Sequence, residues 1–296
     1  MKDTSKDSRR EFLKTSGKAV AAAVAFGGFG TSLFASNLKA VNTSSKGENM
    51  STLTPQAKAN LEKFFGTSKL AQEDLEFFTN YANFAFDEVF AHSQLEEKER
   101  LLLILAALVA IPAKEEFETM LKAALNVKVS PIAIKEVIYQ ATPYVGMGKV
   151  ADILSLTNKV FKQRGIKLPL AKQGRTTKEN RYEKGLQAQV EIFGEGMRSA
   201  RDKAPNDKKH ISEFLSSNCF GDYYTRGGLE LKFRELITFV YLISMGGAEP
   251  QVKAHIQGNL NMGNDRAKLI AVVTALIPYI GYPRSLNALN AIDEIS

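Results

Sequence analysis

The sequence repeats itself, and this repeat constrains the fold more than any other feature. Shifting the chain by 135 positions aligns residues 83–154 with residues 218–289 without a gap. Such a chain is expected to fold as two copies of one structural unit. Identical pairs recur along the alignment, including Asn83/Asn218, Asp87/Asp222, Leu101/Leu236, Ala113/Ala248, Leu125/Leu260, Asn126/Asn261, Val137/Val272, Pro143/Pro278, Tyr144/Tyr279, Gly146/Gly281 and Leu154/Leu289.

Helix signals are dense in both copies, and strand signals are nearly absent. Residues 183–193 and 265–276 carry apolar residues at the helical period. The chain is therefore predicted to be all-α. Its predicted divisions are a first copy at residues 56–161, a linker rich in Lys and Arg at 162–178 and a second copy at 179–296.

A glutamate and a histidine stand on apolar segments of the second copy. Glu235 lies in a run that is apolar on nearly every side and ends at Gly246-Gly247, which predicts a buried helix. His255 lies on the apolar stripe of the next predicted helix. Two antiparallel helices would bring the pair together, and a buried Glu–His pair can move protons near neutral pH. The same spacing also fits a structural pair in the core, so both interpretations stay open at this point.

A longer set of residues in the second copy resembles a known family. Over residues 180–295, their order and spacing resemble those of the carboxymuconolactone decarboxylase family, which has the alkylhydroperoxidase-D-like fold. The resemblance implies a duplicated all-α bundle, homo-oligomeric assembly, no metal and no cofactor, and it places the family's Glu and His on Glu235 and His255. The residues that carry it are Phe220-Gly-Asp-Tyr-Tyr-Thr-Arg226, Arg234-Glu235-Leu236, His255, Leu260, Asn261, Gly263, Pro278-Tyr279, Gly281-Tyr-Pro283-Arg284 and Asn287-Ala288-Leu289.

The activity that the resemblance implies is decarboxylation of a small carboxylated lactone or a related acid. Loss of carbon dioxide would leave a dienolate that must be protonated on carbon, which requires a proton donor and a cation to orient the substrate carboxylate. His255 is predicted to deliver the proton, and Glu235 to orient its ring. The residues expected to bind the substrate are Arg234, Arg284, Tyr279 and Asn287.

The first copy lacks this pair. At the positions of Glu235 and His255 it has Arg100 and Met120, although its apolar framework is kept. We therefore predict that the first copy is a structural half that packs on the second as an internal dimer. One pocket per chain is expected, in the second copy.

Two other classes of function are compatible with this fold. Related alkylhydroperoxidase-D-like proteins are thiol peroxidases with a Cys-x-x-Cys just before the histidine. Here those positions are Ala248 and Gln251, and Cys219 is the only cysteine, so peroxidase activity and an intramolecular disulfide are not expected. A non-catalytic protein that binds a small molecule in the same pocket is the alternative to the enzyme.

The first 40 residues have the features of an export signal. The segment Ser8-Arg9-Arg10-Glu11-Phe12-Leu13-Lys14 matches the twin-arginine pattern, and an Ala/Gly/Val/Phe-rich stretch follows. Glycines interrupt that stretch, so no permanent membrane span is expected. Residues 41–55 are polar and predict a flexible tether. The predicted location is therefore exported and periplasmic.

The charge and the apolar surface indicate which partners to expect. The net charge is +7, of which +4 lies in residues 1–40. The rest of the chain is therefore too weakly basic to suggest that it binds nucleic acid. The predicted helices at 101–111 and 236–243 are more apolar than one small unit can hide. The expected partners are a small-molecule substrate and further copies of the chain, as a trimer of two-repeat chains.

Overall fold

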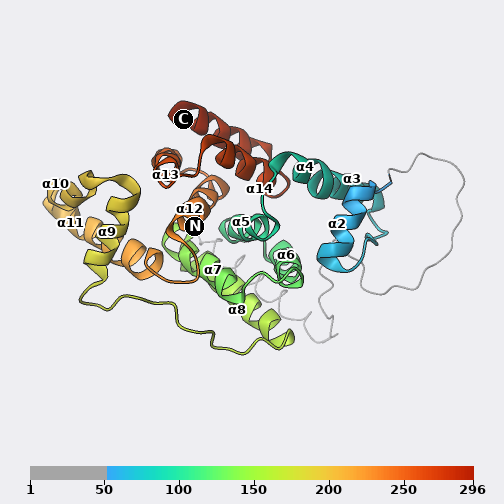
Figure 1. The fold of residues 1–296 in the computed structure, drawn as a ribbon, viewed down its shortest axis with the longest axis horizontal. Helices are drawn as coiled ribbons and strands as arrows, with labels where there is room; N and C mark the ends of the chain where they lie inside the picture. Colours follow the sequence, from blue (N-terminus) through green and yellow to red (C-terminus); the bar gives the residue numbers. More distant parts are fainter. Residues whose placement is uncertain (1–51) are drawn as a thin grey trace, which may run out of the picture. The chain divides into compact units, whose positions relative to one another are not determined.

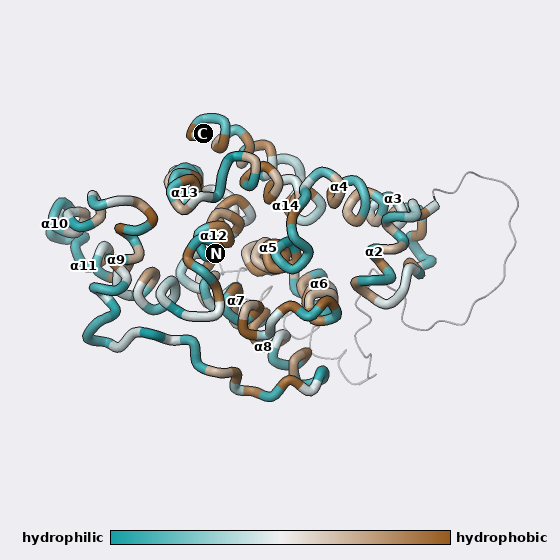
Figure 2. The backbone as a smooth tube through the Cα atoms, in the orientation of Figure 1, coloured by the Kyte–Doolittle hydropathy of each residue, from teal (hydrophilic) through white to brown (hydrophobic). Residues whose placement is uncertain are grey.

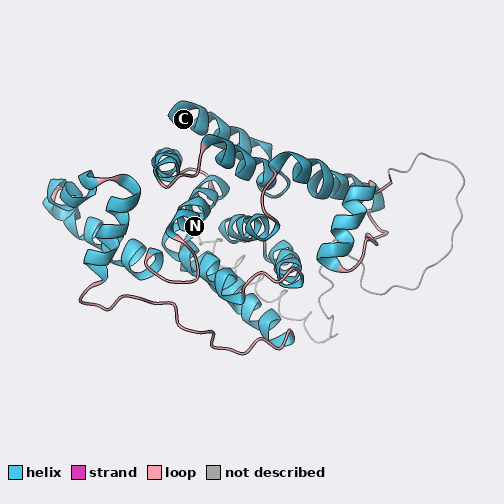
Figure 3. Ribbon diagram, viewed as in Figure 1, coloured by secondary structure: helices cyan, strands magenta, loops and turns pink. Residues whose placement is uncertain are grey.

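The computed structural model describes residues 52–296, which lie within one unit that spans Ser32–Ser296. Within this range the secondary structure is helical and contains no strand (Figure 3). The all-α prediction is therefore confirmed. The predicted export signal at residues 1–40 and most of the predicted tether lie outside the described residues.

The helices fall into two series that match the two copies (Figure 1). The first series is α2 (Pro55–Phe65), α3 (Leu75–Asn83), the π-helix η1 (Phe84–Glu88), α4 (Val89–Ser93), α5 (Glu97–Ala110), α6 (Lys114–Asn126), α7 (Pro131–Val145) and α8 (Met147–Gln163). The second series is α9 (Arg181–Phe193), the 3₁₀ turns η2 (Glu195–Ser199) and η3 (Asn206–Lys208), α10 (Ala200–Lys203), α11 (Lys209–Phe214), the π-helix η4 (Leu215–Tyr224), α12 (Leu231–Met245), α13 (Glu249–Asn261) and α14 (Arg266–Ile295).

The repeat of 135 positions is visible helix by helix. The bounds of α6 and α13 differ by 135 at both ends, and α5 corresponds to α12. Helices α7 and α8 correspond to the two halves of α14, which are separated by a break at Gly281. Gly281 has φ 77° and ψ 165°, and its equivalent Gly146 has φ 83° and ψ 151°. These are backbone conformations that glycine adopts more readily than other residues, so the conserved break has a simple physical cause.

Two apolar helices form the centre of the fold. Every residue of α5 from Arg100 to Ala110 is buried, and so is every residue of α12 from Arg234 to Ser244. The two helices pack against each other, α7 packs on α12, and α14 packs on α5. The two copies therefore form one shared core, as predicted for an internal dimer. Figure 2 shows the apolar residues along α5 and α12.

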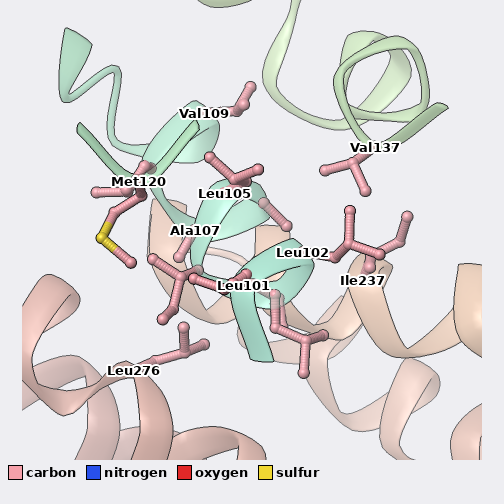
Figure 4. Packing of buried hydrophobic residues seen from close by; sticks show 14 of the residues in the cluster. Leu101, Leu102, Leu105, Ala107, Val109, Met120, Val137, Ile237 and Leu276 are labelled. Atoms are coloured by element: carbon pink, nitrogen blue, oxygen red, sulfur yellow. The ribbon is translucent and has the colours of Figure 1, made fainter. Parts of the chain in front are cut away.

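The core is filled by aliphatic side chains from both copies. In the cluster drawn in Figure 4, Leu102 of α5 lies toward Ile237 of α12, and Leu101 of α5 lies toward Leu276 of α14. All four side chains are buried. Burial of this kind is the main favourable contribution to folding, and here it holds the two copies together.

The second copy also has a smaller cluster around α9 and η4. These two helices meet at glycines, because a methyl group added at Gly185 would lie 1.8 Å from the carbonyl oxygen of Ser216. A methyl group at Gly221 would lie 2.1 Å from the carbonyl oxygen of Arg181. The close approach fixes η4, the element that carries Cys219 and Tyr224, against α9.

Of the described helices, α14 is the one whose length and composition would allow it to cross a membrane. It is broken at Gly281, and it packs on α4, α5, α12 and α13.

Candidate functional site

Glu235 and His255 are brought together in the second copy. Glu235 lies on α12 and His255 on α13, and the two glycines Gly246 and Gly247 allow the chain to reverse between them. Nδ1 of His255 lies 2.5 Å from Oε1 of Glu235. Glu235 is fully buried, and His255 is 8% exposed. The pair that helical spacing predicted is therefore formed, and it leaves Nε2 as the ring nitrogen without a hydrogen-bond partner among residues 52–296.

The carboxylate of Glu235 is held on its other side by a tyrosine. The Tyr224 hydroxyl donates to Oε2 of Glu235 at 3.1 Å and lies 2.5 Å from Oγ1 of Thr238. Asn259 donates to the main-chain oxygens of both Glu235, at 3.2 Å, and His255, at 2.7 Å. These contacts fix the carboxylate and join α12 to α13 at the level of the pair.

The first copy contributes to this network. Tyr144, on α7, donates from its hydroxyl to that of Tyr224 at 2.9 Å. Gln140, also on α7, donates to Oγ1 of Thr238 at 3.0 Å. Burial raises the pKa of both Tyr144 and Tyr224 well above the usual value, so both hydroxyls keep their protons. The chain of hydroxyl groups that ends at Glu235 therefore stays neutral and keeps its donors.

A pocket of about 780 Å³ opens beside His255. Its wall is largely apolar and aromatic. The imidazole of His255 lies edge-on to the rings of Phe193 and Tyr144, with centroid distances of 5.3 and 5.9 Å. Among the described residues that line the pocket there is no lysine or arginine. The lining residues are Pro143, Tyr144, Gln189, Phe193, Met197, Leu215, Cys219, Phe220, Leu242, Met245, Ala248, Gln251, Ala254, His255 and Gln257.

Arg234, predicted to bind the substrate, is not part of this pocket. Its side chain is fully buried, and Nη2 donates to Oε2 of Glu136 at 3.0 Å. Nη1 donates to Oε1 of Gln140 at 2.8 Å. The guanidinium group thus joins α12 to α7 of the first copy. A charged group on a buried helix needs such partners. The contacts with Glu136 and Gln140 therefore account for Arg234, and no bound substrate is needed to explain it.

The other three predicted binding residues do not line this pocket either. Arg284 and Asn287 line an adjoining pocket of about 290 Å³, which shares Leu242 and Ala248 with the pocket of His255. Tyr279 packs against the first copy, where its hydroxyl is 3.9 Å from the sulfur of Met120. The residue that fills the equivalent place beside His255 is Tyr144. Each copy therefore supplies the tyrosine of its Pro-Tyr pair to the other copy: Tyr144 lies beside His255, and Tyr279 lies beside Met120.

The first copy has no acid–base pair at the equivalent position. Arg100, which replaces Glu235, donates to Oγ of Ser93 at 3.1 Å and stacks over the ring of Phe90 at 3.9 Å. Met120, which replaces His255, is fully buried. The first copy therefore retains the apolar packing at this place without the Glu–His pair.

Several residues of the site are ones that the sequence did not single out. Gly258 is the clearest of these, since a methyl group there would lie 2.5 Å from Oε1 of Glu235. Tyr224 and Thr238 contact the carboxylate network directly. The alignment of Tyr144 with Tyr279, combined with an internal dimer, could have indicated the exchange of tyrosines between copies. Within residues 52–296, no three His, Cys, Asp or Glu side chains are grouped as a metal site requires.

Comparison with known proteins agrees with this architecture. The sequence profile of the carboxymuconolactone decarboxylase family matches twice, at residues 76–159 and 210–294. The chain is also similar to 4-carboxymuconolactone decarboxylase of Acinetobacter baylyi, with 27% identity over 118 residues, which is 40% of this chain and 87% of that protein. The two matches cover most of α3 to α8 and most of α11 to α14, and together they cover more than half of the chain. The chain is therefore a member of the carboxymuconolactone decarboxylase family, with two copies of the family's domain.

Proposed function

We propose that the chain is a cofactor-free decarboxylase, or a closely related lyase, that acts on a small carboxylated lactone or a related acid. The observation that carries the proposal is the contact between Nδ1 of His255 and Oε1 of Glu235 at the wall of an apolar pocket. A carboxylate that fixes Nδ1 leaves Nε2 to exchange a proton with a bound molecule. The similarity to 4-carboxymuconolactone decarboxylase supports the same class of reaction.

In the proposed reaction, the bond between the substrate carbon and its carboxylate breaks, and carbon dioxide leaves. The electron pair enters the unsaturated lactone and gives a dienolate. Nε2 of His255 then donates a proton to carbon, and solvent later restores that proton to the imidazole. Glu235 acts as the positioning residue, because it holds the ring and stabilises the imidazolium form.

The composition of the pocket determines how the substrate carboxylate is destabilised before carbon dioxide leaves. Since no lysine or arginine lines the pocket, a bound carboxylate would face mainly aromatic and aliphatic groups. A charge confined to two oxygens is disfavoured in such surroundings, while the dienolate spreads its charge over several atoms. Among the residues that line the pocket, an imidazolium at His255 would be the cation that pairs with the substrate carboxylate. The pocket thus favours the loss of carbon dioxide without a dedicated carboxylate anchor.

The missing anchor also favours the second candidate, a protein that binds a small molecule without turning it over. A neutral or weakly polar ligand would suit the apolar lining better than an acid. The two functions differ in one observable. A binding protein would retain its affinity and show no turnover, whereas the proposed enzyme would convert the ligand.

Thiol peroxidase chemistry remains outside the proposal. Cys219 lines the pocket, and it is the only cysteine of the chain. Burial raises the pKa of its thiol to about 12, so the nucleophilic thiolate is scarce at neutral pH.

The test begins with a thermal-shift screen of the protein against lactones and aromatic acids, followed by turnover assays with each hit. We expect His255→Gln to lower turnover by about 10²–10⁴-fold with little change in binding. Met120→Ala, at the equivalent position, is the matched control and should leave the chemical step unchanged. Full activity in His255→Gln would refute the assignment, and unfolding of that variant would favour a purely structural pair.

A further inference from the structure

A second pocket, remote from His255, lies between the first copy and the linker. It has a volume of about 560 Å³. Helices α7 and α8 form one wall, and the linker residues 168–173 form another. In Figure 1 this linker runs as a long loop from the end of α8 to α9. The lining residues are Ile132, Lys135, Glu136, Tyr139, Leu154, Asn158, Lys162, Leu168, Pro169, Leu170, Ala171, Lys172, Gln173 and Arg226.

The charged residues of this pocket are mostly positive. Three lysines and one arginine line it, against a single carboxylate, that of Glu136. That carboxylate is already paired, because Arg226 donates to both of its oxygens at 2.9 Å and Arg234 donates to Oε2 at 3.0 Å. The negative charge of Glu136 is thus satisfied by two guanidinium groups. It is not available to neutralise the lysines.

Lys135 is the unusual member of this set. Its side chain is 4% exposed, and no carboxylate within residues 52–296 pairs with it. Its ammonium group lies 2.5 Å from Oδ1 of Asn158 and near the faces of Tyr139 and Phe161, at 5.7 and 5.8 Å. An ammonium group has three donors, so one amide oxygen leaves donors that can serve a ligand. A buried charge without a counterion is costly, and a bound anion would relieve that cost.

The rest of the lining is apolar. Ile132, Leu154, Leu168 and Leu170 provide aliphatic surface next to the cationic groups. In the second copy, the positions equivalent to Lys135 and Glu136 are Ile270 and Ala271, so the repeat does not account for this pocket. The combination of a buried ammonium group with aliphatic walls suits a ligand with a small anionic head and an apolar body.

We infer that this pocket binds a small organic acid, whose carboxylate pairs with Lys135 and Arg226 while its apolar body lies against the leucines of α8 and the linker. The site is separate from the pocket of His255, and it belongs to the first copy. Burial lowers the pKa of Lys135 to about 8, so the ammonium form still predominates at pH 7 and can pair with the acid.

The test is isothermal titration calorimetry of the full chain with sodium benzoate and sodium hexanoate at pH 7. Benzamide serves as the neutral analogue and inorganic phosphate as an anion without an apolar body. We expect saturable binding of a carboxylate, weaker binding of the amide and no binding of phosphate at equal concentration. Lys135→Met keeps the aliphatic stem and removes the charge, and it should weaken carboxylate binding by about 10- to 100-fold.

Two further variants make the outcome unambiguous. Leu170→Trp would fill the pocket from the linker side and should also abolish binding, without disturbing a buried charge. Leu215→Trp, which fills the pocket beside His255, should bind the acid as the unaltered chain does, because Leu215 does not line the pocket of Lys135. The inference is overturned if neither acid binds, if phosphate binds instead, if Lys135→Met or Leu170→Trp binds normally, or if Leu215→Trp loses the binding.

Discussion

Tyr144 of the first copy lies edge-on to the imidazole of His255 in the second copy, with the ring centroids 5.9 Å apart. Its hydroxyl donates to Tyr224, which in turn donates to Glu235. The acid–base pair of one copy therefore depends on a helix of the other. The second copy by itself lacks one wall of the pocket and one donor of its hydrogen-bond network.

This dependence predicts the effect of Tyr144→Phe. The variant keeps the ring and removes the hydroxyl that donates to Tyr224. A hydrogen bond between neutral groups contributes about 1 kcal/mol, so turnover should fall by roughly 3- to 10-fold. Tyr279→Phe is the matched control at the equivalent position, and its kcat should be unchanged. Equal losses in the two variants would contradict the assignment of Tyr144 to the site.

Gly258→Ala should damage the site through Glu235. The added methyl group would lie 2.5 Å from Oε1 of the carboxylate, so the carboxylate must leave the position in which it contacts His255. A displacement of about 1 Å near reacting groups can lower turnover by roughly 10²-fold. The control is Gly148→Ala on α8, where nothing lies within 4 Å of the added methyl group. Gly148→Ala should be neutral or stabilising, since alanine favours helices. Normal kcat in Gly258→Ala would show that the position of Glu235 is unimportant.

The buried Lys135 predicts a pH-dependent stability. Burial lowers its pKa from the ordinary 10.5 to about 8, so between these values the unfolded chain holds a proton that the folded chain has lost. Stability rises with pH wherever the unfolded state binds more protons. The destabilising effect of Lys135 is therefore largest below pH 8 and declines above it. The Tm advantage of Lys135→Met over the unaltered chain should shrink as the pH rises from 7 to 9. A constant difference in Tm would contradict the shifted pKa.

We propose that the chain also assembles, as a trimer of two-repeat chains. The apolar helices that first suggested assembly, α5 and α12, are buried within the chain. The remaining apolar surface includes Ile211 and Phe214 on α11 and Tyr282 and Leu286 on α14, each more than half exposed. Each pair lies at helical spacing on one helix face, and exposed apolar side chains grouped in this way favour association. Light scattering at micromolar concentration should give three times the chain mass, and Phe214→Ser should reduce it. A monomer mass for the unaltered chain would refute the proposal.

We further propose export by the twin-arginine route, which the residues outside the described range suggest. Replacing Arg9 and Arg10 by lysine should trap the precursor in the cytoplasm, while the unaltered chain is exported and loses about 40 residues at its N-terminus. Cell fractionation followed by mass spectrometry measures both effects. Unchanged export of the double variant would exclude this route.

The fold and the acid–base pair could be predicted because both depend on local patterns. The repeat gave two helical units, and the apolar stripes placed Glu235 and His255 on facing helices. Periodicity shows which side of a helix is buried, and a short glycine-containing connection makes neighbouring helices antiparallel. These two rules were sufficient to expect the two side chains near each other, and the structure supplies the contact of 2.5 Å between Nδ1 and Oε1.

The substrate-binding residues could not be placed in the same way. Arg234 stands next to Glu235 in sequence, but successive residues of a helix point in different directions. Its partner Glu136 is 98 positions away, in the other copy. The prediction that Tyr279 binds the substrate was wrong for a related reason. Helix α14 packs against the first copy, and Tyr144 of α7 occupies the place beside His255. Contacts between copies depend on how the helices dock, which a pattern within one copy does not specify.

Because the two copies exchange Tyr144 and Tyr279 within one chain, the site should stay complete when the protein is diluted. A site shared between two separate chains is complete only while those chains remain associated, so its integrity depends on their concentration. Here both copies belong to one polypeptide, so Tyr144 faces His255 at an effective concentration of about millimolar order or higher. Even if the assembled chains separate in dilute surroundings, the acid–base pair keeps its tyrosine, and the site should work in a single molecule.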